Sequence, residues 1–224
     1  MSRNLLPVHL RLGGEEVDIV DNFQYLGSIL SSDNTIHQEI SNRIQKASNF
    51  YRAVHQLLWD ETFPQASKIS LYRMYLQPIL TFGLEAATLT GPANSRLQAT
   101  EMKFLRSCLQ KTRMDKIRNV DIRQQLGLER SLLETLEFKR LRWYGHMRRM
   151  APHRIPQVYF NKSVPGKRPR GRPRDIWVKQ IHKDLEVRDT NWHQIHEQKL
   201  WMDRNNWRRL LYPACWSEEM MMMI

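Results

Sequence analysis

The sequence contains little cysteine and no long apolar run. Its two cysteines, Cys108 and Cys215, are too few for a disulfide framework or for a four-ligand zinc site. It has no stretch of 18 or more apolar residues, which excludes a membrane-spanning helix. Its first residues also lack the apolar region of a signal peptide. We therefore expect a protein of a reducing intracellular compartment.

Acidic residues are scarce relative to basic ones. The 224-residue chain has 35 Lys and Arg against 23 Asp and Glu, for a formal net charge of +12. Hydrophobic residues make up 41% of the chain, which is enough to form the core of one or two domains. A basic excess of this size favours a polyanionic partner, and by charge alone both nucleic acid and an acidic membrane surface fit.

The excess of positive charge lies in one segment. Residues 139–174 contain twelve of the 35 Lys and Arg and no Asp or Glu, so the rest of the chain is balanced, with 23 residues of each sign. A solvated surface normally carries both signs, whereas a run without acids is typical of a surface that binds a polyanion. We expect Arg142, Arg148 and Arg149 to contact the partner from this segment.

Hydrophobic patterning predicts a mainly α-helical chain with a small N-terminal β-hairpin. Apolar and polar residues alternate within residues 5–30, around a Gly13-Gly14 turn. Helical periodicity follows over residues 36–58, with Asn34 or Thr35 as the N-cap. Further helices are expected over residues 69–79 (with a kink at Pro78), 97–109, 119–126, 131–149, 175–187 and 194–211. Five prolines between residues 150 and 174 predict that no helix crosses that stretch.

These patterns divide the chain into four parts. Residues 1–33 form the β-hairpin and residues 34–150 form a helical bundle. Residues 151–174 form a basic linker rich in proline and arginine, and residues 175–224 form a C-terminal helical extension. The sequence predicts this order from periodicity and from the positions of glycine and proline.

Aromatic and histidine residues in the C-terminal half predict packing and not chemistry. Trp143, Trp201 and Trp207 stand beside Leu or Met at helical spacing, which favours a place in the core over base stacking. His193 and His196 are three residues apart but lack Cys or acidic partners at ligand spacing. We therefore expect no metal site and no cofactor.

Residues 166–174, Gly-Lys-Arg-Pro-Arg-Gly-Arg-Pro-Arg, form the most specific short motif. Its prolines hold the backbone extended, and Gly171 has no Cβ to prevent close approach to a groove floor. Arginines beside the glycine can then lie in a narrow A·T minor groove. The core of the motif resembles an AT-hook, and a nuclear-import signal or an inert basic linker would have the same composition. The residues expected to bind are Lys167, Arg168, Arg170, Gly171, Arg172 and Arg174.

Four sequence blocks follow one another along the chain: residues 20–30, residues 40–47 with 76–85, residues 141–150, and residues 166–177. In this order they resemble the C-terminal part of a non-LTR (LINE-type) retrotransposon reverse transcriptase. The first block resembles the primer-grip strands, the second the first thumb helices, the third the segment after the thumb, and the fourth the basic tail. The resemblance extends over most of the chain.

The resemblance implies roles for individual residues. Phe23, Tyr25, Leu26 and Gly27 occupy primer-grip-like positions, and the helical bundle would be thumb-like. One departure is visible, because this chain has Ala87 where the family commonly has Trp.

Catalytic groups are missing. Template-directed polymerisation needs carboxylates that hold two metal ions, and the family supplies an Asp-Asp pair for them, which this chain lacks. The resemblance places the first residue downstream of that catalytic loop, so we expect no polymerase activity and no catalytic residues. Asp175 with Asp184 and Glu186 does not reproduce a restriction-like endonuclease pattern either.

The function that we expect is non-catalytic nucleic-acid binding. The partner would be the backbone of RNA, DNA or a hybrid, including an A·T-rich minor groove, and not a membrane. The basic motif favours the nucleus over the cytoplasm. An inert translated remnant of a degraded retrotransposon and a helical protein-interaction module remain as alternatives. The sequence does not indicate an oligomeric state.

Overall fold

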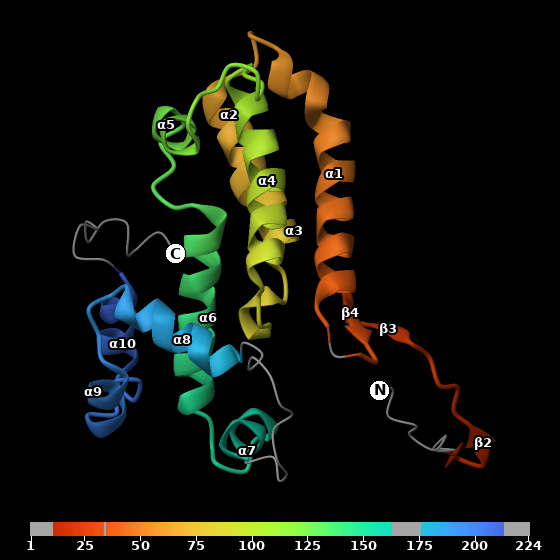
Figure 1. The fold of residues 1–224 in the computed structure, drawn as a ribbon, viewed down its shortest axis with the longest axis vertical. Helices are drawn as coiled ribbons and strands as arrows, with labels where there is room; N and C mark the ends of the chain where they lie inside the picture. The colour runs from red at the N-terminus through yellow and green to blue at the C-terminus, as the bar shows by residue number, and fades with distance from the viewer. Residues whose placement is uncertain (1–10, 34, 163–175, 213–224) are drawn as a thin grey trace.

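The computed structural model describes residues 11–33, 35–162 and 176–212 (Figure 1). The chain is mainly helical with β-hairpins at its N-terminal end, which confirms the predicted fold class. The strands are β1 (Arg11–Leu12), β2 (Glu15–Glu16), β3 (Asn22–Tyr25) and β4 (Ser28–Ser31). The helices are α1 (His37–Trp59), α2 (Gln65–Leu71), α3 (Gln77–Thr81), α4 (Gly91–Cys108), α5 (Asn119–Gln125), α6 (Leu132–Arg148), α7 (Ile155–Asn161), α8 (Trp177–Glu186), α9 (Trp192–Glu197) and α10 (Arg204–Leu211).

The N-terminal β structure consists of two short antiparallel hairpins, β1–β2 and β3–β4. Each closes through a two-residue turn with positive φ at both positions, Gly13-Gly14 in the first and Leu26-Gly27 in the second. Two positive φ angles fit a type I′ turn, which matches the twist of the paired strands. Leu26 adopts a φ of +47°, a conformation that costs a residue with a side chain about 1–2 kcal/mol.

A buried ion pair attaches the second hairpin to α1. The Arg43 guanidinium donates to the Glu39 carboxylate at 2.5 Å and to the Gly27 carbonyl oxygen at 2.7 Å. The other Glu39 oxygen accepts from the Ile29 backbone N–H at 2.7 Å. Both charged side chains are buried, so the β3–β4 hairpin is part of the packed structure.

The start of α1 differs from the prediction. The N-cap is Ile36 and not Asn34 or Thr35, and it makes no side-chain capping bond. Thr35 instead donates its backbone N–H and its hydroxyl to the Asp33 carboxylate, in a local turn before the helix. The side chains of such polar residues can either cap a helix or form a local turn, and here they form the turn.

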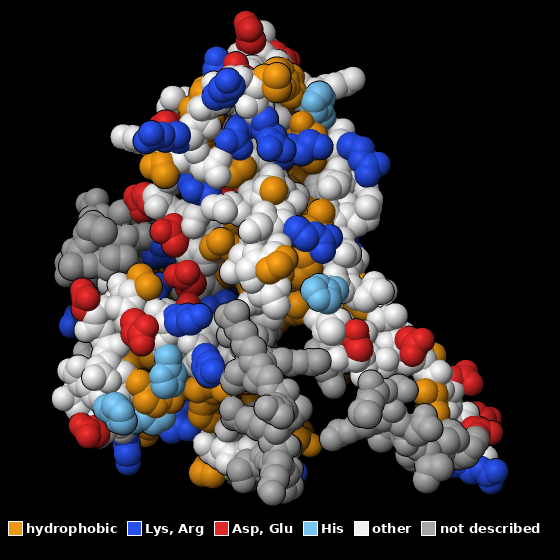
Figure 2. Space-filling view, viewed as in Figure 1, with side chains coloured by type: hydrophobic (Ala, Val, Ile, Leu, Met, Phe, Trp, Pro, Cys, Tyr) orange, Lys and Arg blue, Asp and Glu red, His pale blue; other side chains and the backbone are white. Residues whose placement is uncertain are grey.

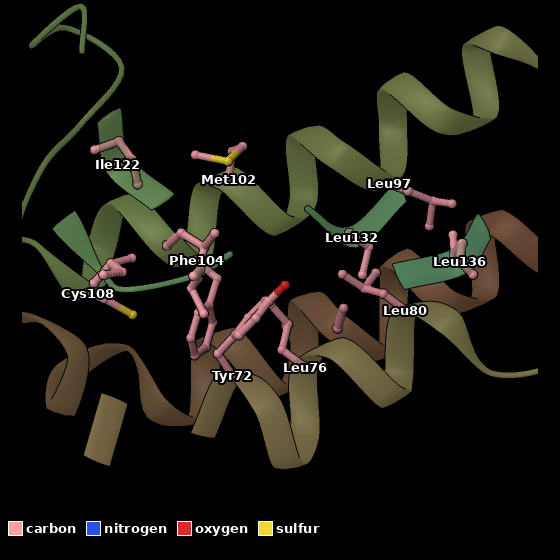
Figure 3. Close-up of a cluster of buried hydrophobic side chains, with 14 of the residues drawn as sticks. Tyr72, Leu76, Leu80, Leu97, Met102, Phe104, Cys108, Ile122, Leu132 and Leu136 are labelled. Carbon is pink, nitrogen blue, oxygen red and sulfur yellow. The ribbon is translucent and has the colours of Figure 1, made fainter. Parts of the chain in front are cut away.

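The first core is enclosed by α1 to α5 and by the start of α6 (Figure 3). Tyr72, Leu76, Leu80 and Phe104 are almost completely buried in it. A π-helical turn over Tyr72–Leu76 joins α2 to α3, just before Pro78. The helix is therefore irregular just before Pro78, which lacks a backbone donor and crowds the preceding turn.

A buried carboxylate crosslinks the first core. Glu101 accepts from the Tyr72 hydroxyl at 2.8 Å and from the Leu132 backbone N–H at 2.9 Å. Arg123 donates to its second oxygen at 3.1 Å. Glu101 therefore connects α4 to the π-helical turn, to α5 and to the start of α6.

The second core forms around the rest of α6. Tyr144 of α6 is completely buried, and Trp201 and Trp207 pack close to it, as predicted for these two tryptophans. The remaining members come from α6, α8, α9 and α10: Phe138, Leu141, Met147, Ile181, Leu185, Ile195, Leu211 and Tyr212. One helix, α6, thus contributes to both cores.

The helices of the C-terminal half are shorter than predicted. The short helix α7 lies within the proline-rich stretch without crossing it, and Pro156 lies in its first turn, where a missing N–H costs no hydrogen bond. The predicted helix over residues 194–211 is two helices, α9 and α10. Asp203 is the N-cap of α10, and its carboxylate accepts hydrogen bonds from the backbone N–H groups of Asn205 and Asn206.

Candidate nucleic-acid interface

A cleft of about 710 Å³ lies between α6 and α10. We call it the α6–α10 cleft. Among the described residues, five of the side chains that line it are basic, one is acidic, and several are aromatic. They are Glu85, Phe138, Lys139, Arg142, Trp143, His146, Arg149, Arg204, Trp207, Arg208, Leu211 and Tyr212.

Helical spacing brings these residues to one surface. On α6, positions 139, 142, 143, 146 and 149 recur every three or four residues, so they share one face. On α10, positions 204, 207, 208 and 211 do the same. Arg142 and Arg204 are exposed, whereas Lys139 is half-buried and donates to the Thr81 hydroxyl at 2.7 Å.

A glycine allows α10 to pack closely on α6. A Cβ atom added to Gly145 would lie 2.1 Å from Nε1 of Trp207, which no real structure tolerates. The same indole N–H donates to the Leu141 carbonyl oxygen at 3.2 Å. Gly145 and Trp207 therefore set the distance between the two helices, and with it the depth of the cleft.

The electrostatics of the cleft favour an anion. Burial lowers the pKa of Lys139; Glu85 opposes this shift and Arg142 adds to it. Burial also lowers the pKa of Arg149, and Arg204 contributes to that shift by repulsion. Among the described lining residues, Glu85 is the one acid beside several cations that repel one another, so binding of an anionic ligand would relieve this repulsion.

The structure brings together only some of the residues predicted to bind nucleic acid. Arg142 and Arg149 line the cleft, and Arg149 also donates to the Trp201 carbonyl oxygen at 2.7 Å. Arg148 does not line it: its guanidinium lies over the rings of Phe160 and Trp201, at 5.5 and 4.6 Å from their centroids. The AT-hook-like residues Lys167, Arg168, Arg170, Gly171, Arg172 and Arg174 lie outside the described residues.

The primer-grip-like residues occupy a different place. Phe23, Tyr25, Leu26 and Gly27 belong to the β3–β4 hairpin at the foot of α1, on the opposite side of the molecule from α10 (Figure 1). The first three side chains are exposed, and the Gly27 carbonyl oxygen is held by Arg43. This hairpin therefore takes no part in the cleft.

Sequence reasoning missed most of the cleft residues, among them Arg204, Arg208 and Trp143. Arg204 and Arg208 lie outside the basic run, and their four-residue spacing around Trp207 was the signal that could have found them. Trp143 was expected in the core, but it is only half-buried and faces the cleft beside His146, with 5.6 Å between the ring centroids. That prediction was wrong for Trp143.

A second basic surface lies along α1 and α4. Lys46, Arg52, Arg96 and Lys103 are exposed there, and the acidic residues of these two helices, Glu39 and Glu101, are buried. The Lys103 ammonium group lies 4.7 Å from the centroid of the Tyr51 ring. Figure 2 shows Lys and Arg side chains gathered over the upper ends of these helices.

Within residues 11–33, 35–162 and 176–212, no group of three or more His, Cys, Asp or Glu side chains is arranged to hold a metal ion. Across the same ranges, no helix is both long and apolar enough to cross a bilayer.

Comparison with known proteins gives one informative relative. No protein-family model matches the chain, and no solved structure matches it. A transposon-derived protein of Caenorhabditis elegans is 25% identical to it over 203 residues, which cover 86% of this chain and 70% of the relative. The chain is therefore similar to a transposon-derived protein, which supports the transposon origin that the sequence blocks predict.

Proposed function

We propose that this chain is a nucleic-acid-binding protein without catalytic activity, derived from the C-terminal part of a LINE-type reverse transcriptase. The observation that carries the proposal is the α6–α10 cleft, in which five basic side chains and one acidic side chain surround aromatic residues. Cations bind the phosphate backbone, and aromatic rings bind bases. A polyanion without bases would use the cations alone.

Three observations support this choice of partner. The relative in Caenorhabditis elegans is transposon-derived, and transposition requires proteins that bind nucleic acid. The exposed basic surface of α1 and α4 offers a second area for backbone contact. The basic motif of residues 166–174 follows α7 in the sequence and adds five more Lys and Arg.

Salt dependence tests the proposal. The full chain is titrated with single-stranded, duplex and RNA–DNA hybrid oligonucleotides at several salt concentrations. Each phosphate contact contributes about −0.7 (single strand) to −0.9 (duplex) to the slope of log K against log salt. Replacing Arg142 and Arg204 with Ala together should make the slope shallower by about 1.4–1.8.

A matched control uses basic residues outside the cleft. Arg209 lies on α10 beside Arg208 but does not line the cleft, and Lys183 is exposed on α8. The Arg209→Ala and Lys183→Ala double variant removes the same charge and should leave the slope unchanged. Equal changes in the two double variants would reduce the proposal to non-specific attraction by net charge.

The basic motif is tested separately. Replacing Arg170 and Arg172 with Ala should make the duplex slope shallower by about 2, and Gly171→Val should weaken binding to A·T-rich duplex without a change of charge. If Gly171→Val binds that duplex as well as the parent does, the AT-hook interpretation is wrong. A chain that binds no oligonucleotide at low salt would instead fit an inert remnant.

A further inference from the structure

We propose that the α6–α10 cleft takes single-stranded nucleic acid in preference to duplex, with one base stacked on Trp143. This inference rests on the proposed function and names the substrate class of the same site. It follows from the shape of the cleft, from the position of Trp143 and from the arrangement of the charges around it.

The shape of the cleft fits a group that projects from its strand. Proteins read duplex DNA by inserting a convex element, a helix or a β-ribbon, into the major groove. The α6–α10 cleft is concave, and its volume of about 710 Å³ lies in the range of pockets that enclose small molecules. A base turned out of a single strand is a flat projecting group that this cleft can take in with room for part of its backbone, whereas bases inside a duplex are stacked and cannot enter.

Trp143 differs from Trp201 and Trp207, the two fully buried tryptophans of the second core. Trp201 and Trp207 are buried and pack near Tyr144, whereas Trp143 is half-buried and opens into the cleft. Its neighbouring ring is His146, which is exposed on the same face of α6. Trp143 is therefore an indole that the fold leaves accessible between cations. Accessible aromatic rings beside basic groups are the usual platform for single-stranded bases.

The charges stand on both sides of this ring. Arg142 and Arg149 of α6 are seven residues apart, which places them about 10 Å apart along the helix axis. Trp143 and His146 lie between them, and Arg204 and Arg208 face them from α10. A strand that crosses the cleft can thus place phosphates on the arginines while one base reaches the indole.

This arrangement favours a nucleic acid over an acidic peptide. The carboxylates of a peptide would pair with the arginines but would gain nothing specific from the accessible indole of Trp143. Stacking of a base contributes about 5- to 100-fold in affinity, and this is the quantity that the experiment measures.

The experiment uses the full chain carrying Arg170→Ala and Arg172→Ala, so that the basic motif contributes less to binding. The probes are a short oligothymidine single strand, the duplex that it forms with its complement, and a peptide of glutamates of equal charge. The variants are Trp143→Leu, which removes the stacking platform, and Trp143→Phe, which keeps an aromatic ring. Trp59→Leu on α1 is the control, because Trp59 is exposed and lies outside the cleft.

The expected result is a loss of affinity for the single strand alone. Trp143→Leu should weaken binding of the single strand about 5- to 100-fold with an unchanged salt slope, and should leave duplex and peptide binding unchanged. Trp143→Phe should retain most of the affinity, and Trp59→Leu all of it. Thermal unfolding of each variant checks that the fold is intact.

Two outcomes separate this inference from the proposed function. If Trp143→Leu binds the single strand as the parent does while Arg142→Ala with Arg204→Ala still makes the salt slope shallower, the stacking inference is wrong and the nucleic-acid proposal stands. If the arginine variants have no effect on the slope, both are wrong. Tighter binding of duplex or peptide than of single strand also overturns the inference.

Discussion

The two halves of α6 differ in charge as sharply as they differ in surroundings. Residues 132–137 carry Glu134 and Glu137 and no Lys or Arg, and they pack into the first core through Leu132 and Leu136. Residues 138–148 carry four Lys and Arg and no acid, and they pack into the second core. The net charge of α6 therefore changes from negative to positive at the point where the helix passes from the first core to the second.

This difference separates charges that hold the fold from charges that face a ligand. In the first core, Glu101 is bonded to three partners from three other segments. In the second core, Arg140 pairs with Asp184 at 2.6 Å on a buried side of α6. The α6–α10 cleft instead has five cations around one acid. The paired buried groups Glu101, Arg140 and Asp184 should control the stability of the fold. The cations of the α6–α10 cleft should control ligand binding.

The largest effect is expected from Glu101→Leu in the first core. The substitution removes the acceptor of Tyr72 and the Leu132 N–H and leaves the Arg123 charge without its partner in a nearly buried position. Breaking such a pair costs about 3–5 kcal/mol of unfolding free energy. Urea unfolding followed by circular dichroism measures it.

Glu134→Gln is the matched control for this variant. Glu134 is exposed, and Gln can replace it in the capping box with Ser131, so a small effect is expected. A Glu101→Leu chain that is as stable as the parent would show that the first core does not depend on its ionic centre.

Gly145→Ala should have the next largest effect, and it should be specific to the second core. The added Cβ forces the Trp207 indole away from α6 and should cost about 1–3 kcal/mol. Because the same contact sets the depth of the α6–α10 cleft, oligonucleotide binding should weaken in parallel. Unfolding followed by tryptophan fluorescence and a binding titration measure the two effects.

Gly91→Ala provides the control for Gly145→Ala. Gly91 is also helical, and beyond its two chain neighbours nothing lies within 4 Å of an added Cβ. Pro92 follows it and disfavours a helical residue with a Cβ, which offsets the helix propensity of alanine, so we expect a much smaller change in stability than for Gly145→Ala. Equal behaviour of the two variants would contradict the close packing of α10 on α6.

The smallest effect is the pH dependence of the second core. Burial lowers the pKa of His182 and of His196; Glu186 opposes the shift of His182, whereas Arg148 and the other histidines add to the shift of His196. The unfolded chain therefore takes up protons first as the pH falls below about 6.5. The stability of the second core should therefore decrease as the pH falls below about 6.5 and through the lowered pKa values of the folded imidazoles.

His196→Gln checks the origin of this pH dependence. His196 is hydrogen-bonded to the Tyr144 hydroxyl at 3.0 Å and lies against the rings of Trp192 and Trp201. Removing the titrating group should flatten the dependence of the melting temperature on pH. An unaltered pH profile in this variant would assign the effect to other groups.

Periodicity predicted the helices well because most of them bury one apolar face. The stripes that contain Ile40, Tyr72, Leu105 and Leu136 all lie in the first core. The prolines did not indicate α7, because Pro156 lies in the first turn of that helix, where proline is tolerated, and not in its interior. Local patterns therefore identified the elements and misplaced some of their boundaries.

The candidate site was only half predictable. Arg142 and Arg149 were found because they belong to a run without acids. Arg204 and Arg208 were missed because they lie outside that run in the sequence. They come close to Arg142 and Arg149 only because Trp207 packs on Gly145, a contact between residues far apart in the sequence. Trp143 was missed for a related reason: its spacing matches the buried stripe of α6, and only the position of α10 decides which residues of that helix stay accessible.

Photochemical crosslinking tests the central claim most directly. The full chain is irradiated with a single-stranded oligonucleotide that contains 4-thiothymidine, and the crosslinked peptides are identified by mass spectrometry. We predict crosslinks on both walls of the α6–α10 cleft, at Trp143 or its neighbours on α6 and between residues 204 and 208 on α10. Crosslinks confined to α1, α4 or residues 166–174, with none on α6 or α10, would contradict the account.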